Sequence, residues 1–396
     1  MYLRYLKQLT AVVLLLALVL CASACQRSCE IAKTDAGVPC VVKLAAVGDI
    51  MMSEDQLQAV RKSDGSYDFA SVFSSVSGDL VGADLTVGNF EGNLCGDPAD
   101  AATMNYPTAL AKALQDVGFD VLQTANTYSM ENGLSGLRST KNVLQSCGIQ
   151  TVGTFTDEDD RAENAVTVVM VNGIRIAFVA FTKGINNVRL PDGTDYCVNL
   201  LYRDYDSNYS EVNRSGIAAC MEEANKQNPD IIIAMVHWGS EYSEKISQTQ
   251  QEIETLLLQN GADVILGSHS HIVGRMEQKK ITMSDGKKKS VFVAYSLGNF
   301  YCDSYDSDAQ TSMILNLEFT KYTDGTAKIT GASYTPVYIA DHGKGASVRY
   351  QVLNARNAIR QYDDNYYDRV SPEIYDKLRK SIEDLSNRME WNFNAQ

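Results

Sequence analysis

The sequence predicts an α/β protein. Short apolar runs with strand-like composition alternate with helix-like segments through the first two thirds of the chain. Three later strand-like runs follow one another without helices, which predicts antiparallel additions to the sheet. An apolar content of 45% in 396 residues allows a sizeable core, in one large domain with additions or in two domains.

The expected elements follow from apolar spacing and from Gly, Pro and polar residues at their ends. Strands are expected at 41–47, 83–91, 119–126, 149–153, 175–182, 230–236 and 262–267. Helices are expected at 69–76, 107–118, 136–148, 211–228 and 247–260. The later antiparallel strands are expected at 291–298, 313–319 and 328–339, and a charged helical segment over 350–390. Residues 183–209, rich in Tyr, Asp and Asn, are expected to form a long loop that walls a cleft.

The first residues, 1–24, have the pattern of a signal peptide. Arg4 and Lys7 precede an apolar run over 11–20, and small residues occupy 22–24. The apolar run is shorter than the ~20 residues that a helix needs to cross a bilayer. Cys25 follows directly, as the acylated cysteine does in bacterial lipoproteins. We therefore expect an extracytoplasmic, membrane-anchored lipoprotein; soluble secretion and an uncleaved anchor are the alternatives.

The charge of the chain bears on its partners. The formal net charge is −14, and removal of the signal peptide, with Arg4 and Lys7, makes it more negative. Nucleic acid is excluded as a partner because its phosphates would be repelled. Bulk repulsion also disfavours a polyanionic ligand, although a bound metal ion can reverse the local sign. The nine cysteines include no closely spaced C-x-x-C pair, so a zinc knuckle is not expected, and disulfides cannot be assigned.

Polar residues that can bind a metal follow five of the predicted strands. Ligands of α/β proteins bind beyond the carboxyl ends of the strands, where these side chains would meet. Each has an ordinary alternative: a helix cap for the Asp, a solvated surface group for the Glu, a turn former for the Asn, a packed core residue for each His. Their coincidence, with three of only four histidines at strand ends, predicts a metal site. The candidates are Asp49, Glu91, Asn126, His237, His269 and His271.

The motifs around these residues resemble those of CapA-type poly-γ-glutamate capsule synthesis proteins. They occur in the same order: "GDIMM", "NFEG", "ANTYSMENG", "HWGSEY", "GSHSH" and "YSLGNF". That family is similar to the calcineurin-like metallophosphoesterases, and the resemblance implies a four-layer αββα sandwich. With the elements expected above, the chain divides into a signal peptide over 1–24, a lipid-anchored tether over 25–40, a domain over 41–340 that the resemblance makes metallophosphatase-like, and a helical extension over 341–396.

The resemblance also implies a role for each candidate in binding one or two divalent metal ions, Mn, Zn or Fe. Asp49 resembles the first metal aspartate and Glu91 a bridging carboxylate. His237 and His269 resemble ligands of one metal position, which Asn126 completes. The other position keeps Asp49, Glu91 and His271, because Met51 stands where phosphoesterases have a histidine and a thioether is a poor ligand for a hard metal.

A second departure concerns the catalytic groups. Tyr128 stands where the capsule family has a histidine, and tyrosine, with an ordinary pKa of about 10, is poorly matched to proton transfer at neutral pH. Glu241 is the other catalytic candidate, as a group that orients a ligand or acts as a base; it could equally be a surface residue of the next helix.

Two functional hypotheses follow from these features. The first is a metal-dependent hydrolase or transferase acting on an acidic or phosphorylated envelope polymer, such as poly-γ-glutamate, or on a phosphoester. The second is a non-catalytic protein that uses its metal to hold the polymer, or that serves as an accessory subunit of a membrane capsule synthase.

Overall fold

The computed structural model describes residues 37–304, 307–366 and 370–388. The predicted signal peptide, Cys25 and nearly all of the predicted tether lie outside these residues. The chain divides into Met1–Val38 and Pro39–Gln396, and the fold is that of the second unit. None of the helices in the described part of the chain has the length and apolar character needed to span a membrane.

The first sheet has eight strands, and its inner strands are parallel. Strands β1 to β4 pair in parallel, whereas β12, β13 and β14 add on in antiparallel fashion beside β1. A short strand, β11, pairs in parallel with the end of β1. The strands in sheet order are β14 (Tyr350–Asn354), β13 (Ala327–Asp341), β12 (Thr311–Lys321), β1 (Cys40–Ile50), β2 (Leu85–Phe90), β3 (Val121–Gln123) and β4 (Gln150–Val152), with β11 (Asn299–Tyr301) beside β1.

The second sheet has six strands, of which the central four are parallel. The two edge strands, β5 and β9, are antiparallel to their neighbours. The strands in sheet order are β5 (Thr167–Val171), β6 (Ile174–Thr182), β7 (Ile231–His237), β8 (Val264–Ser268), β10 (Lys288–Ala294) and β9 (Met276–Thr282).

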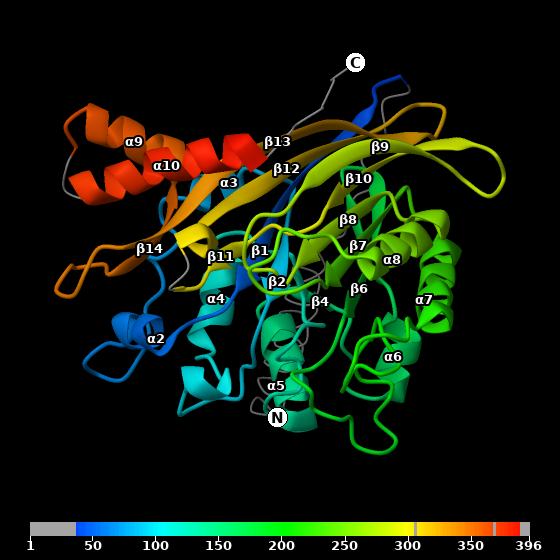
Figure 1. The fold of residues 1–396 in the computed structure, drawn as a ribbon, viewed down its shortest axis with the longest axis horizontal. Coiled ribbons are helices and arrows are strands. Elements are labelled where there is room, and N and C mark those ends of the chain that lie inside the picture. The colour runs from blue at the N-terminus through cyan, green and yellow to red at the C-terminus, as the bar shows by residue number, and fades with distance from the viewer. Residues whose placement is uncertain (1–36, 305–306, 367–369, 389–396) are drawn as a thin grey trace, which may run out of the picture. The chain divides into compact units, whose positions relative to one another are not determined.

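Helices cover the outer faces of both sheets (Figure 1). Over the first sheet lie α2 (Glu54–Val60), α3 (Ser77–Val81), α4 (Ala109–Asp116) and α5 (Gly133–Ser146). Over the second lie α7 (Arg214–Lys226) and α8 (Gln248–Gln259), and α6 (Glu158–Asn164) precedes β5. The chain continues into α9 (Ala355–Asp363) and α10 (Pro372–Arg388), which pack on β13 and β14.

Side chains on opposite faces of each inner strand pack into different layers of the core. Leu44 and Ala46 of β1 pack between the two sheets, in one core with Phe178 of β6. Ala45 and Val47 point the other way, into the core under the helices of the first sheet. Because successive residues of a strand face opposite sides, a strand buried on both faces is apolar along its length, as β1 is from Leu44 to Val47, before Asp49 near its end. The predicted α/β fold, a four-layer αββα sandwich with a C-terminal helical segment, is confirmed.

Three details of the predicted elements are wrong. Residues 69–76 form successive turns instead of a helix, and Ser74 donates its hydroxyl to the Ser71 carbonyl, a local bond that competes with helix formation. Strand β10 is parallel to β8, not antiparallel. Residues 350–354 form β14, paired with β13, so the sheet continues into the segment predicted to be helical.

The long loop predicted over 183–209 is present. Among the described residues no regular helix or strand lies between the end of β6 at Thr182 and the start of α7 at Arg214. This loop packs partly against the core, since Ile185, Leu190 and Leu201 are buried. It lies beyond the carboxyl end of β6, on the side of the sheet where the polar candidates are found.

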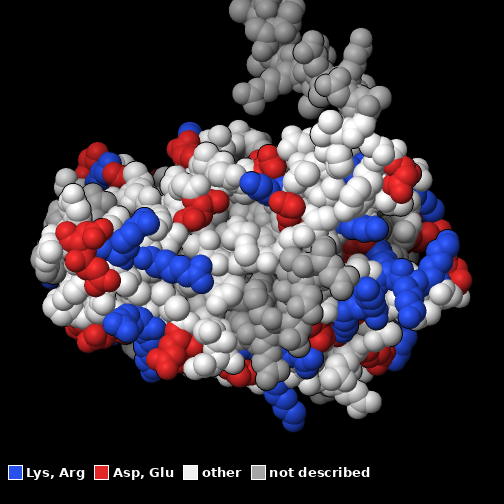
Figure 2. All heavy atoms as spheres, turned by 90° about the horizontal axis from the view of Figure 1, so that it is seen from above, with Lys and Arg blue, Asp and Glu red and all other residues white. Residues whose placement is uncertain are grey.

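The surface charge is uneven despite the acidic composition. Five lysines lie on the β9–β10 hairpin, and Figure 2 shows basic side chains gathered on its right, where Figure 1 places that hairpin. Lys289 is paired with Asp263 at 2.8 Å, and Lys279 is paired with Glu254 and Glu277. Lys280, Lys287 and Lys288 are exposed. No disulfide joins the six described cysteines.

Gly48 provides a test of the packing that places Asp49. A Cβ added at Gly48 would lie 1.7 Å from the carbonyl oxygen of Gly298, a backbone atom that cannot rotate away. We expect Gly48→Ala to lower the free energy of unfolding by more than about 3 kcal/mol, measured by urea denaturation. Gly78→Ala is the matched control, because its Cβ would meet nothing within 4 Å in a helix. Equal stabilities of the two variants would contradict this assignment.

Candidate metal centre

The six predicted metal ligands lie where the parallel strands of the two sheets end. Strand β1 of the first sheet contacts β8 of the second, so the residues beyond their carboxyl ends meet (Figure 1). The side chains come from segments that are far apart in the sequence. Asp49 and His271 are 222 residues apart, yet His271 Nδ1 lies 3.2 Å from the Asp49 carboxylate. All six are buried: Asp49, Glu91, Asn126, His237, His269 and His271.

The charged candidates form three overlapping groups that could hold a metal ion. One contains Glu91, His237 and His269, and a second contains Asp49, Glu91 and His271. In each group the ligand atoms lie within 4.8 Å of one another. Glu91 belongs to both, so its carboxylate stands between them. The third group contains Glu241 with the two histidines that follow β8.

Asn89 joins the carboxylates to the histidines, and the sequence analysis missed it. Its side-chain amide donates to Asp49 at 2.8 Å and to Glu91 at 3.3 Å, and lies 3.4 Å from His237 Nδ1. Asn89 is part of β2, two residues before Glu91 and therefore on the same side of the strand. A polar residue within an otherwise apolar strand is the signal that could have identified it.

Asn126 lies beneath the group instead of among its charged members. Its amide nitrogen donates to the Phe90 carbonyl at 2.6 Å and to Asn89 Oδ1 at 3.1 Å. Its own oxygen accepts from the backbone amide of Tyr128 at 3.2 Å. A carbonyl oxygen has two lone pairs, so one acceptor site is left for a metal. The contacts present in the structure make Asn126 the residue that orients Asn89.

The histidine rings are held by neighbouring polar groups. His237 Nδ1 lies 3.0 Å from the Ser268 hydroxyl, and its Nε2 lies 2.9 Å from Thr127 Oγ1 and 3.4 Å from Glu91. His271 Nδ1 lies 3.0 Å from Asn299 Oδ1. Asn299 follows the turn at Gly298, and its position opposite Asp49 is fixed by the pairing of β1 with β11. Such partners fix ring orientation in metal sites.

The backbone after β8 adopts an unfavourable conformation. The φ angles of His269 and His271 are 89° and 60°, in the left-handed region that favours glycine. A residue other than glycine held there costs about 1–3 kcal/mol, which the surrounding structure must offset. The turn brings this segment against Asp49: His269 donates its backbone amide to the carboxylate at 3.3 Å, and the His271 ring lies 3.2 Å from it.

The charges of these buried groups are coupled. Burial would raise the pKa of Asp49, but the hydrogen bond and charge of His271 hold it below its usual value. Burial would lower the pKa of His271, but Asp49 and the nearby Glu91 raise it to about 9. Burial and the charges of neighbouring cations lower the pKa of His269 well below its usual value. His269 is therefore a neutral imidazole at pH 7, the form that binds a metal.

The donor set fits a divalent cation. Two carboxylates, Asp49 and Glu91, are fully buried, and one oxygen of Glu91 has no hydrogen-bond partner in the structure. A buried carboxylate oxygen without a partner is costly, and a metal ion would satisfy it. Carboxylate and imidazole ligands suit Mn, Fe and Zn.

The remaining candidates lie at the border of the group. Tyr128 is half-buried; burial and the charges of Glu91 and Glu241 raise its pKa to about 12, so it is a hydrogen-bond donor at neutral pH. Glu241 is exposed and lies in the turn before α8, not on the helix. Met51 packs against the core beneath the helices of the first sheet.

Solved phosphohydrolase structures are similar to this chain at low identity. The NAD nucleotidase NadN of Haemophilus influenzae is 15% identical, with 88% of this chain and 61% of that chain covered and a TM-score of 0.44. The calcineurin-like phosphoesterase YfkN of Bacillus subtilis is 13% identical, with 87% and 100% covered and a TM-score of 0.43.

Curated relatives and a family match identify the family. The capsule biosynthesis protein CapA of Bacillus anthracis is 27% identical over 271 residues, which are 66% of this chain and 59% of that protein. The PGA biosynthesis protein CapA of Bacillus subtilis strain 168 is 26% identical over 336 residues, with 81% and 77% covered. This chain thus spans less than two thirds of the Bacillus anthracis relative. Residues 43–304, more than half of the chain, match the family described as bacterial capsule synthesis protein PGA_cap, and the chain belongs to that family.

Proposed function

We propose that this protein is a metal-dependent hydrolase or transferase that acts on an acidic envelope polymer such as poly-γ-glutamate. The observation that carries the proposal is the buried carboxylate of Glu91, which is shared by two histidine-containing groups and has one oxygen that accepts no hydrogen bond. A phosphoester substrate is the variant of this proposal that the resemblance to phosphoesterases supports.

The chemistry divides between the metal and the side chains around it. A bound divalent ion would polarise a carbonyl or phosphoryl oxygen and lower the pKa of water. His237 and His269 would hold it through ring nitrogens, and Asn89 would keep both carboxylates in place. Tyr128, protonated at pH 7, would donate a hydrogen bond or a proton. Glu241, exposed and grouped with His269, is the better base of the two.

The proposed polymer is inferred from the relatives, and the proposed extracytoplasmic location from the sequence of residues 1–25. Both curated relatives are named for capsule or PGA biosynthesis. An acidic polymer must approach a chain with a net charge of −14, which a bound cation would make easier. An extracytoplasmic lipoprotein, as the sequence of residues 1–25 predicts, would lie where such a polymer is assembled, near a membrane synthase that it could assist.

A second candidate function is metal-assisted binding of the polymer without turnover. Two observations favour it. The raised pKa of Tyr128 makes it a weak proton donor at neutral pH. Met51, which packs against the core, stands where a phosphoesterase would have another histidine ligand. As an accessory subunit of a capsule synthase, the protein would then present or hold the polymer.

The metal proposal can be tested at His269. We expect wild-type protein, loaded with Mn and desalted, to retain metal that His269→Gly loses, measured by inductively coupled plasma mass spectrometry. In chelator the melting temperature of His269→Gly should equal or exceed that of wild type, because glycine relieves the φ of 89°. Wild-type protein that binds no Mn, Zn or Fe would refute the metal site. A variant that loses metal and also unfolds would contradict the assigned strain.

Catalysis can be tested separately with metal-loaded protein. We expect hydrolysis of γ-glutamyl oligomers or of p-nitrophenyl phosphate that His269→Gly reduces at least about 100-fold. Tyr128→His should raise kcat at pH 7 by about tenfold or more, because an imidazole titrates near neutral pH.

Tyr128→Phe is the matched control for the hydroxyl group, with metal content as the check on the site. Metal-loaded wild type that turns over neither substrate, with Tyr128→His equally inactive, would favour the binding function.

A further inference from the structure

A cavity of about 300 Å³ opens beside the metal centre. Thr127 and His269 line it: Thr127 contacts His237, and His269 belongs to the metal-binding group. The loop that follows β6 also lines the cavity, with Lys183 and Asn187. The cavity thus joins the candidate metal centre to the loop that the sequence predicted to wall a cleft.

We infer that this cavity is a subsite for an anionic group, a carboxylate or a phosphate, and that Lys183 recognises it. The inference rests on the proposed function, since the group would belong to a ligand whose reacting atoms lie at the metal centre. It adds a binding residue and a ligand chemistry to that proposal.

Lys183 is placed by the same strands that place the metal ligands. It directly follows β6, and its backbone amide donates to the carbonyl of His237 at 2.8 Å. Its ammonium donates to the Gly239 carbonyl at 2.8 Å and lies 4.7 Å from the centre of the Tyr209 ring. The side chain is thereby held over the cavity, because both contacts fix its far end.

The charge of Lys183 is not neutralised by an ion pair. Among the described residues, the lysine ion pairs involve other lysines, and Glu241, which lines the same cavity, forms no ion pair with Lys183. An ammonium has three donors, and one is used by Gly239. Lys183 therefore offers a half-buried cation with donors to spare, in a chain whose net charge is −14. An anionic ligand can bind to a negatively charged protein only where a local positive charge attracts it.

The wall opposite the metal centre is held in shape by its own contacts. Tyr209 donates its hydroxyl to Asn187 at 3.0 Å, and Asn186 donates to Glu131 at 2.9 Å. Gly184 allows a close approach, because a Cβ there would lie 2.7 Å from both the Tyr205 carbonyl and the Tyr209 ring. A preformed wall lowers the entropic cost of binding a ligand.

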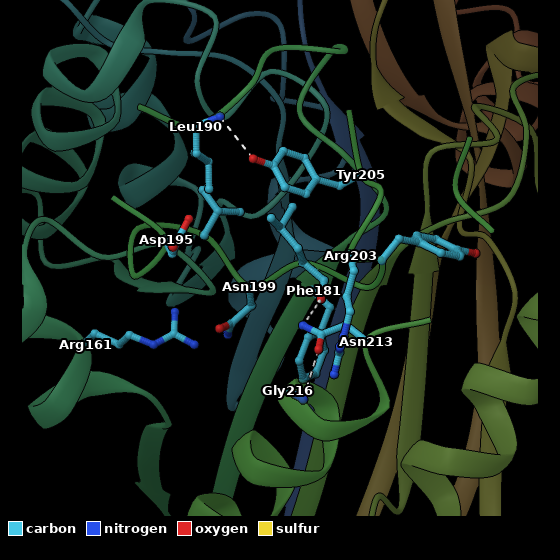
Figure 3. Close-up of a pocket in the computed structure, with 12 residues that line it drawn as sticks. Arg161, Phe181, Leu190, Asp195, Asn199, Arg203, Tyr205, Asn213 and Gly216 are labelled. Atoms are coloured by element: carbon cyan, nitrogen blue, oxygen red, sulfur yellow. Dashed lines mark hydrogen bonds between the residues drawn. The ribbon is translucent and has the colours of Figure 1, made fainter. Parts of the chain in front are cut away.

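The residues that line a second cavity under the same loop have a structural role (Figure 3). This cavity measures about 230 Å³. The backbone amide of Leu190 donates to the Tyr205 hydroxyl, a hydrogen bond that Figure 3 draws as a dashed line and that is 3.1 Å long. Arg161 donates to the Tyr196 carbonyl at 2.6 Å, and Asn213 accepts from Gly216 at the start of α7. These groups are engaged in holding the loop, whereas Lys183 lines the cavity beside the metal centre together with His269.

The test is ligand binding measured by calorimetry on full-length, Mn-loaded protein. The two probes are a γ-linked glutamate tetramer and inorganic phosphate, which separate a carboxylate from a phosphate ligand. We expect Lys183→Met to weaken binding of at least one probe tenfold or more, which is about 1.4 kcal/mol. Lys183→Arg should retain binding within about threefold. Lys112→Met, which removes an exposed lysine on α4, is the matched control.

The outcomes separate the subsite from the proposed function. Loss of tetramer binding alone assigns a carboxylate ligand, and loss of phosphate binding alone assigns a phosphate. Unchanged binding of both probes in Lys183→Met, with metal content preserved, overturns the subsite while the metal proposal stands. Wild-type protein that binds neither probe also overturns it. A Lys183 effect on binding without any turnover supports the subsite and rejects catalysis.

Discussion

The burial of two carboxylates at the meeting point of the two sheets is the constraint on which the rest of the site depends. Asp49 and Glu91 are fully buried, and leaving such charges without compensation would be costly. The fold compensates with the amide of Asn89, with the His271 ring 3.2 Å from Asp49 and with the His237 ring 3.4 Å from Glu91. One oxygen of Glu91 nevertheless accepts no hydrogen bond, which marks the place where compensation by the protein alone ends.

Close backbone contacts make this meeting possible. Gly48 and Gly267 each lie so near a backbone carbonyl that a Cβ would reach within 1.7 Å and 2.0 Å of its oxygen. One contact fixes the strand that carries Asp49, and the other precedes the turn that carries the histidines. The positive φ angles of that turn add a local cost, which the compact packing of the strands offsets. The strained turn thus lowers the stability of the fold at the segment that positions the two histidines.

The sequence predicted the fold and most of the site for a simple physical reason. Buried parallel strands are apolar throughout, so the polar residues that end them stand out, as Asp49 and His237 do. The same reasoning missed Asn89, because it considered only residues that follow a strand, whereas Asn89 lies within β2. It failed for residues 69–76, where serines favour turns over a helix. The placement of Lys183 beside the cavity depends on the pairing of β6 with β7, which no local pattern reveals.

The central claim is that the group around Glu91 binds a divalent metal ion. Anomalous diffraction at the manganese edge, from crystals of the full chain grown with Mn²⁺, tests it most directly. We expect an anomalous peak within about 2.0–2.2 Å of the Glu91 carboxylate, with His237 and His269 or with Asp49 and His271 as further ligands. An anomalous map with no peak at Glu91, or with peaks only at surface carboxylates, would contradict it.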